Sequence, residues 1–189
     1  YNQQNLYVGV FFFVLLGKKS TRVINFKRDF EVRSSDFLGL VFDGFNDKRN
    51  CMVFTTNPYG VQRDFLSFDA SYLDLDWDGL WKVRTSRTDS GWIAEYAIPW
   101  KTLRYSMTTD SLQTWGFNIN RGRRMTNENY AMSPFPRSFS VLRMDYAGQL
   151  THLQPPPPST NIRIQPYFLV LNERYKNSEN GLPDATKPK

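Results

Sequence analysis

The chain has 189 residues, of which 40% are hydrophobic and 22% are charged, and its formal net charge is +6 at pH 7. This length allows one domain with a substantial core and is too short for two large domains. The single cysteine, Cys51, excludes an internal disulfide, and with the single histidine, His152, it excludes a zinc site of the His/Cys type. The longest basic run is only Arg121-Gly122-Arg123-Arg124, so we expect no nucleic-acid partner despite the positive charge.

Short segments with an apolar period of two, separated by turn residues, dominate the chain and predict β-strands. The first, Leu6–Leu16, is almost wholly apolar but too short for a transmembrane helix, which needs about 20 residues, so we predict a strand buried on both faces. The other predicted strands are Phe37–Asp43, Cys51–Thr56, Val61–Phe68, Trp81–Thr88, Trp92–Ile98, Trp115–Arg124 and Ile162–Leu171, with shorter ones near Ser140–Arg143 and Gln149–Leu153.

The segments between these strands have the composition of tight turns. Asn57-Pro58-Tyr59-Gly60 has proline and glycine at the positions that a β-turn favours, and Asp89-Ser90-Gly91 predicts a hairpin. The segment Pro99–Arg104, which begins with proline, is the one predicted short helix. We therefore predict an all-β fold, an antiparallel β-sandwich with jelly-roll or immunoglobulin-like layers and one short helix.

A run of four prolines, Pro155–Pro158, predicts a domain boundary because proline donates no backbone hydrogen bond and favours an extended chain. We expect a sandwich domain over residues 1–153 and a linker over residues 154–160. Residues 161–189 are expected to form one further strand and a mobile tail.

Five segments, taken in their order and spacing, resemble the family 9 carbohydrate-binding module, a β-sandwich of the DOMON-like kind. The segments are Asn5–Val10, Phe42–Asp47, Asn57–Gln62, Gly91–Trp100 and Trp115–Arg121. The resemblance is closest to the version found at the N-terminus of bacterial outer-membrane proteins of otherwise unknown function. It implies an oligosaccharide or polysaccharide as partner, and a location in the periplasm or outer membrane of a Gram-negative bacterium. It also implies a first strand before Asn5 and a C-terminal membrane β-barrel, both absent from this sequence.

Sugar recognition uses flat aromatic faces, together with polar side chains that bond hydroxyl groups. Strand parity predicts that Trp81, Trp92 and Trp115 point into the core. Trp77 lies in an acidic loop and Trp100 opens the predicted helix, so these two are the candidates for stacking against a sugar. A structural role remains the alternative for both.

The strand that contains Trp115 presents Asn118 and Asn120 on its opposite face and leads into Arg121. Amides and a guanidinium along one edge suit hydroxyl or carboxylate groups, so these three residues are candidates for hydrogen bonds to a glycan. The alternative is a solvated sheet face that ends in a basic hairpin.

The loop Asp74-Leu75-Asp76-Trp77-Asp78-Gly79 matches the opening of a calcium loop, whose alternate carboxylates can face one cation. An EF-hand requires glutamate six residues after the glycine, where this chain has Thr85, so that assignment fails. A looser Ca²⁺ site at Asp74, Asp76 and Asp78 that also includes Asp43 or Asp47 remains open, since family 9 modules can hold structural calcium. An exposed acidic loop is the alternative.

Three functions remain open at this point. The first is a non-catalytic carbohydrate-binding module of a cell-envelope protein, which holds a glycan by aromatic stacking and by hydrogen bonds from Asn and Arg. The second is a structural or interaction domain without a glycan site. The third is part of a glycoside hydrolase, which would need two carboxylates across a cleft; Glu95 with Asp78 or Asp43 is conceivable, but nothing in the sequence brings them together.

Overall fold

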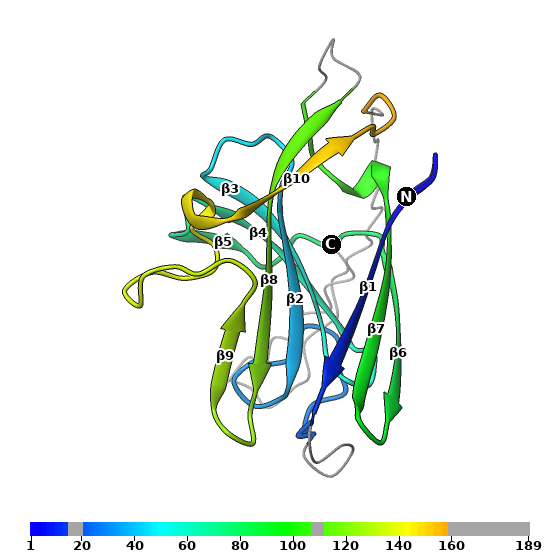
Figure 1. The fold of residues 1–189 in the computed structure, drawn as a ribbon, viewed down its shortest axis with the longest axis vertical. Coiled ribbons are helices and arrows are strands. Elements are labelled where there is room, and N and C mark those ends of the chain that lie inside the picture. Colours follow the sequence, from blue (N-terminus) through cyan, green and yellow to red (C-terminus); the bar gives the residue numbers. More distant parts are fainter. Residues whose placement is uncertain (15–20, 107–111, 159–189) are drawn as a thin grey trace, which may run out of the picture. The chain divides into compact units, whose positions relative to one another are not determined.

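Two antiparallel sheets face each other in the computed structural model, which describes residues 1–14, 21–106 and 112–158 (Figure 1). The small sheet has the strand order β1 (Asn5–Phe13), β7 (Gly91–Pro99), β6 (Lys82–Thr88). The large sheet consists in order of β10 (Gly148–Leu153), β8 (Gln113–Arg123), β2 (Phe37–Asp43), β3 (Asn50–Thr56), β4 (Gln62–Phe68) and β5 (Tyr72–Asp74), with β9 (Glu128–Ala131) paired to β8. The predicted antiparallel β-sandwich is confirmed.

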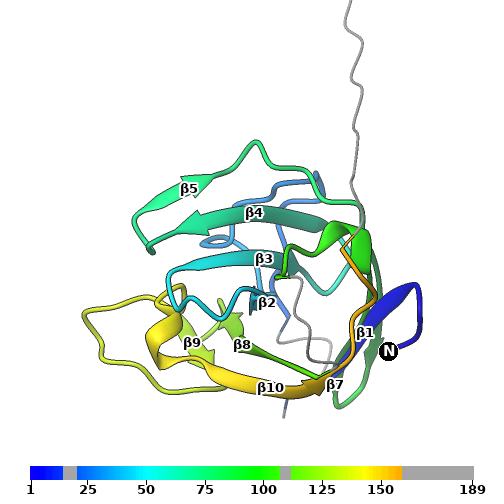
Figure 2. The ribbon, with the colours of Figure 1, turned by 90° about the horizontal axis from the view of Figure 1, so that it is seen from above.

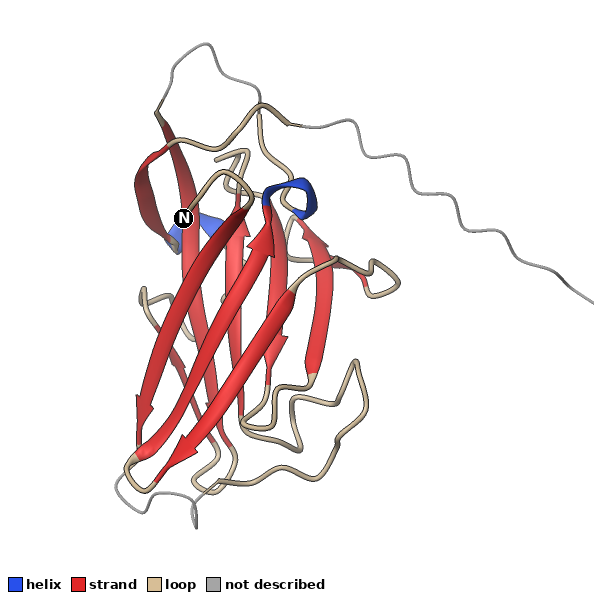
Figure 3. Ribbon diagram, turned by 90° about the vertical axis from the view of Figure 1, so that its right-hand side faces the viewer, coloured by secondary structure: helices blue, strands red, loops and turns tan. Residues whose placement is uncertain are grey.

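The large sheet is wider than the small sheet and curves around it. Seen from above, it runs from β5 and β4 through β3 and β2 to β8 and β10 (Figure 2). Figure 3 turns the small sheet toward the viewer and shows its three strands side by side. The helices in the described part of the chain are two single 3-10 turns, Trp100–Thr102 and Met144–Tyr146, the first of which lies within the predicted helix.

The strand predictions agree with most of the sheet, and their errors have local causes. Strand β2 has the predicted bounds, whereas β5 and β9 were missed because they are short and largely polar or exposed. The segment Ser140–Arg143 is not a strand: it forms a turn that leads into the second 3-10 helix. The predicted strand Ile162–Leu171 and the tail lie outside the described residues.

Strand β1 is not buried on both faces, so that prediction is wrong. Leu6 and Phe12 are 5% and 7% exposed, whereas Phe11 and Phe13, on the other face, are 52% and 61% exposed. The reason is that no described element forms a third layer over the outer face of the small sheet. An almost wholly apolar sequence is therefore only half buried.

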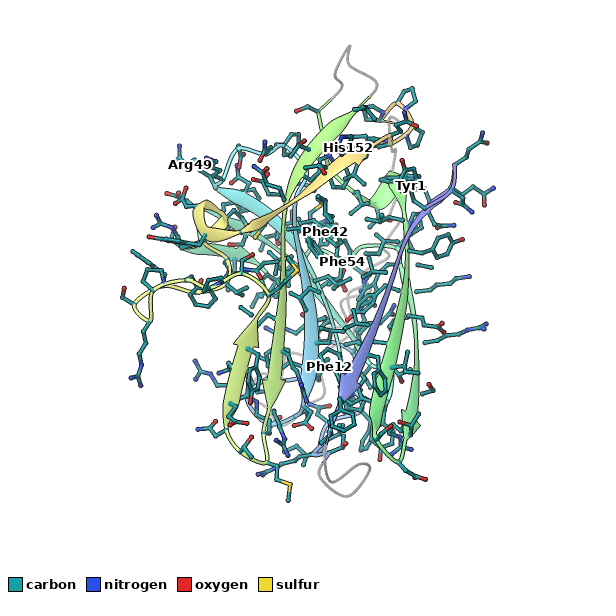
Figure 4. The ribbon with its side chains drawn as sticks, in the orientation of Figure 1. Tyr1, Phe12, Phe42, Arg49, Phe54 and His152 are labelled. Carbon is teal, nitrogen blue, oxygen red and sulfur yellow. The ribbon has the colours of Figure 1, made fainter. Side chains whose placement is uncertain are left out.

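Side chains from both sheets interdigitate to form the main core. Trp92 and Trp115 are 2% and 0% exposed, and Trp81 stacks on Tyr96 with ring centroids 5.6 Å apart, so their predicted core positions are confirmed. Figure 4 shows Phe42 and Phe54 of the large sheet and Phe12 of the small sheet in this layer. Burial of such aromatic side chains is the main source of stability in a domain of this kind.

Two of the motif segments form tight loops because a buried polar side chain binds the loop backbone. The carboxylate of Asp43 accepts hydrogen bonds from the backbone N–H groups of Asp47 and Lys48. The side-chain oxygen of Asn57 accepts them from Tyr59 and Val61. These polar residues therefore have a structural role in shaping the turns.

Candidate functional site

A pocket of about 480 Å³ lies at the end of the sandwich where β1 begins and β7 ends. Figure 1 shows the start of β1 beside the segment that follows β7. The residues lining the pocket are Gln3, Gln4, Asn5, Pro99, Trp100, Lys101, Tyr105, Pro156 and Pro157. Ligand pockets in proteins commonly have volumes of ~300–1,000 Å³.

The apolar side of the pocket is fixed by the turn that ends β7. Pro99 has a φ of −59° and begins the 3-10 turn, which bends the chain so that the Trp100 indole enters the core. The backbone N–H of Trp100 donates to Gln4 O at 3.0 Å, and its indole Nε1 donates to Asn2 O at 2.7 Å. The hydroxyl of Tyr105 donates to Pro156 O at 2.8 Å and thereby ties the proline run to this wall.

Trp100 is only 3% exposed, so it has the structural role that was left open as the alternative. Strand parity gave no information on it, because it follows the last residue of β7. It still lines the pocket, together with Tyr105 and the prolines, but with little exposed surface. The apolar wall is therefore rigid and preformed, but it is not a free-standing stacking platform.

The polar side of the pocket consists mainly of amides. Gln3 and Gln4 are exposed, and in the described structure their side-chain amides make no hydrogen bond to the protein. The Asn5 amide donates to the Tyr7 hydroxyl at 3.2 Å, which leaves its oxygen as an acceptor. Sequence analysis missed these three residues, although an amide-rich stretch next to the first strand was visible.

The predicted aromatic platform and polar edge do not share one surface. Arg121 lies six residues beyond Trp115 along β8, which is ~20 Å at the rise of a β-strand, whereas Trp100 contacts Trp115. The Arg121 guanidinium instead lies 4.8 Å from the centroid of the Phe12 ring. Trp77 is partly buried against Phe54 and does not line the pocket.

Asn118 has a structural environment. It is 1% exposed; its side-chain oxygen accepts from Ser133 N at 3.0 Å and from Ile119 N at 2.9 Å. It thereby fixes the segment that covers the outer face of the large sheet, where Val141 and Met144 pack on Val41. The solvated face expected around Asn118 is in fact covered, whereas Asn120 is partly exposed.

Two of the three aspartate carboxylates of the acidic loop, those of Asp74 and Asp78, have partners within the protein. The Asp74 carboxylate accepts from the backbone N–H of Asp76, and Asp78 forms an ion pair with Arg28. The described residues include no group of three His, Cys, Asp or Glu side chains that could hold a metal ion. A site made by Asp74, Asp76 and Asp78 together is therefore not present in the described structure.

Arg28 also pairs with Asp64, whose carboxylate is buried and accepts the backbone N–H of Gly79. Burial raises the pKa of Asp64, while the Gly79 hydrogen bond and the Arg28 charge act in the opposite direction. Asp64 therefore anchors the acidic loop to β4. This long-range contact links the loop to β4 and to the segment that contains Arg28.

The carboxylates considered for hydrolysis are not arranged as an acid–base pair. Glu95 is exposed on the outer face of the small sheet, and Asp78 is held by Arg28. The described residues that line the pocket include no aspartate or glutamate.

His152 is exposed, and its ring lies 3.0 Å from the Thr151 hydroxyl. No helix in the described residues has the length and apolarity to cross a bilayer.

No protein-family model and no curated protein matches this chain. A solved structure from Bacteroides uniformis, described as a candidate carbohydrate-binding protein, is similar, with 14% identity, a TM-score of 0.60, and coverage of 78% of this chain and 72% of that one. A family 9 carbohydrate-binding module from Caldicellulosiruptor kristjanssonii, solved with cellotriose, has 13% identity, a TM-score of 0.47 and coverage of 88% and 77%. The same module solved with glucose has 12% identity and a TM-score of 0.46, and the match covers 87% of this chain and 77% of that one. At 14% identity, the similarity to the Bacteroides uniformis structure shows that the two chains share a β-sandwich fold.

Proposed function

We propose that this domain is a non-catalytic carbohydrate-binding module that holds a sugar residue of an oligosaccharide or polysaccharide in the pocket at the start of β1. The single observation that carries the proposal is the composition of this pocket. It combines an apolar wall from Trp100, Tyr105 and three prolines with the amides of Gln3 and Gln4. Such a combination suits a pyranose, which has apolar C–H faces and hydroxyl groups in its plane.

The hydrogen bonds in this proposal come from Gln3, Gln4 and Asn5, rather than from Asn118, Asn120 and Arg121. Gln3 and Gln4 offer donors and acceptors that no other described residue uses, whereas the Asn118 oxygen already accepts from Ser133 N. The fold shared with the Bacteroides uniformis protein, described as a candidate carbohydrate-binding protein, is consistent with this role. The proposed cell-envelope location, in the periplasm or outer membrane, rests on the sequence resemblance.

An interaction domain without a glycan site is the second candidate, because the outer face of the small sheet exposes aromatic side chains. Tyr7, Phe11 and Phe13 are 51%, 52% and 61% exposed on one strand. Exposed apolar patches of this kind commonly mark interaction sites. This observation concerns a different face from the pocket, so the two functions do not exclude each other.

A glycan array with the purified domain tests the proposal. We expect signals from a restricted group of glycans, and we expect them to weaken when Gln3 and Gln4 are both changed to alanine. Binding should be weak, because a sugar replaces water hydrogen bonds that are nearly as favourable as those it gains. An array without signal at a high protein concentration would contradict the proposed function.

A further inference from the structure

The free edge of strand β1 has unpaired backbone groups on alternate residues. Trp100 N donates to Gln4 O and Val14 N donates to Ser90 O, so the even-numbered residues of β1 bond to β7. In an antiparallel pair the residues between them point their N–H and C=O groups the other way. Since β1 is the last strand of the small sheet in the described structure, the backbones of Tyr7, Gly9, Phe11 and Phe13 face outward.

The N-terminal turn closes one end of this edge. Asn2 N donates to Asn5 O, and Asn5 N donates to the side-chain oxygen of Asn2. The open part therefore runs from Tyr7 to Phe13. Edge strands of soluble proteins are commonly protected by charged residues, proline or bulges, yet β1 carries no charge and no proline in Asn5–Phe13 and pairs with β7 in an uninterrupted register.

The sandwich is also incompletely closed beside this edge. Val8 and Val10 point inward but are only partly buried, whereas Tyr96 and Ala94, their partners on β7, are 1% and 0% exposed. On the facing large sheet, Ile119 is likewise only partly buried. The apolar side chains of Val8, Val10 and Ile119 therefore keep some exposed surface beside the edge of β1.

A cation lies at this uncovered position. Arg121 points inward from β8, with its guanidinium 4.8 Å from the Phe12 ring centroid and 5.6 Å from that of Tyr130. In the described residues it contacts these two rings but forms no ion pair or hydrogen bond, whereas its neighbour Arg123 pairs with Glu128. Burial lowers the pKa of Arg121, which indicates that its charge is partly desolvated.

We propose that the edge of β1 binds an extended segment of a partner protein as a fourth strand of the small sheet. The segment would be apolar at alternate positions, to cover Val8, Val10 and Ile119, and would carry a carboxylate beside Arg121. The backbone groups supply pairing and the inward side chains supply burial. The carboxylate supplies a direct ion-pair partner for the guanidinium, on which Asp36 and Glu128 act only through their charges. This inference is independent of the glycan pocket.

The test uses a nine-residue peptide of alternating threonine and valine, with one valine replaced by glutamate. Its backbone nitrogens are methylated along one edge, so that it pairs on one side only and does not assemble with itself. A second peptide carries lysine in place of the glutamate. Fluorescence anisotropy with labelled peptides should give an affinity for the glutamate peptide that is about tenfold or more above that for the lysine peptide, because like charges repel beside Arg121.

Two pairs of proteins locate the binding. Gly9→Pro should abolish binding, because the Gly9 N–H points away from β7 and its loss leaves the internal ladder intact. The matched Gly9→Ala variant should bind as the parent does, since an added Cβ at Gly9 meets no atom within 4 Å. Arg121→Gln should bind both peptides with affinities within about twofold of each other. Melting curves establish that each variant is folded.

Absence of binding to the parent, or equal binding by the parent and a folded Gly9→Pro variant, overturns the inference. A preference for the lysine peptide, or a preference for glutamate that survives Arg121→Gln, overturns the role of the charge. None of these outcomes bears on glycan binding, because no sugar is present and the pocket residues are unchanged.

Discussion

The indole of Trp100 meets that of Trp115 edge to face, with ring centroids 6.0 Å apart and planes at 87°. This contact makes the turn after β7 part of the core, although the turn also forms the wall of the surface pocket. The pocket wall is therefore held by the same packing that stabilises the fold. A substitution of Trp100 by alanine would affect stability and binding together, so it cannot test binding alone.

Trp92→Ala and Trp115→Ala should each lower the free energy of unfolding by ~3–5 kcal/mol, because both side chains are almost completely buried and leave a cavity. Urea unfolding followed by circular dichroism measures this. Trp77→Ala is the matched control and should have a smaller effect, since Trp77 is only partly buried. Equal urea unfolding midpoints for the parent and the two core variants would show that Trp92 and Trp115 are not buried in the core.

Asn118→Ala should lower the free energy of unfolding by ~1–3 kcal/mol, because it leaves the partly buried N–H groups of Ser133 and Ile119 without this acceptor. Asn120→Ala, two residues along the same face and partly exposed, should cost less. The same urea experiment compares the two variants. If Asn120→Ala were the more destabilising, Asn118 would not be the residue that holds the covering segment.

The sheet architecture could be predicted from sequence, because it depends on local alternation. The alternation of side chains along β2 and β8 predicts which of them point toward the core, and it predicts the burial of Trp92 and Trp115 in the same way. The half-exposure of β1 could not be predicted this way, because it depends on whether another layer covers the strand. Apolar composition reports what a strand can bury, not what it does bury.

Asp43 should make the domain less stable as the pH rises through its folded pKa. Burial raises that pKa above the ordinary value of 3.8, so the folded state binds more protons than the unfolded state in this window. The contribution of Asp43 is then fully present below about pH 3.8 and is lost as its carboxyl ionises.

Urea midpoints of the parent and of Asp43→Asn between pH 4 and pH 7 measure this dependence. The stability advantage of the parent over the variant should shrink with rising pH, and then become constant. An advantage that grows with pH would mean that the hydrogen bonds from Asp47 and Lys48 outweigh burial, and that the folded pKa is lowered.

Calcium and chelator should leave the melting temperature unchanged to within ~1 °C. The reason is that Asp78 pairs with Arg28, and that Asp74 and Asp76 are linked through a backbone hydrogen bond. Differential scanning calorimetry with calcium chloride and with EDTA tests this. A rise of several degrees with calcium would show that the loop rearranges to bind the cation.

The candidate site was harder to predict than the fold, because its residues come from three distant segments. Gln3 and Gln4 precede the first strand, Trp100 follows the seventh, and Pro156 belongs to a run that was interpreted as a linker. The hydrogen bond from Tyr105 to Pro156 holds that run at the wall. Asn118 shows the opposite case: a suitable residue type on the expected face, already used by the protein itself.

Calorimetric titration of the strongest glycan from the array tests the central claim most directly. It compares the parent with a Gln3→Ala/Gln4→Ala double variant and with Gln149→Ala, an exposed glutamine on β10 that does not line the pocket. We predict at least a roughly tenfold loss of affinity in the double variant, at an unchanged melting temperature, and no loss in Gln149→Ala. Equal affinity in all three proteins would show that the pocket at the start of β1 does not hold the glycan.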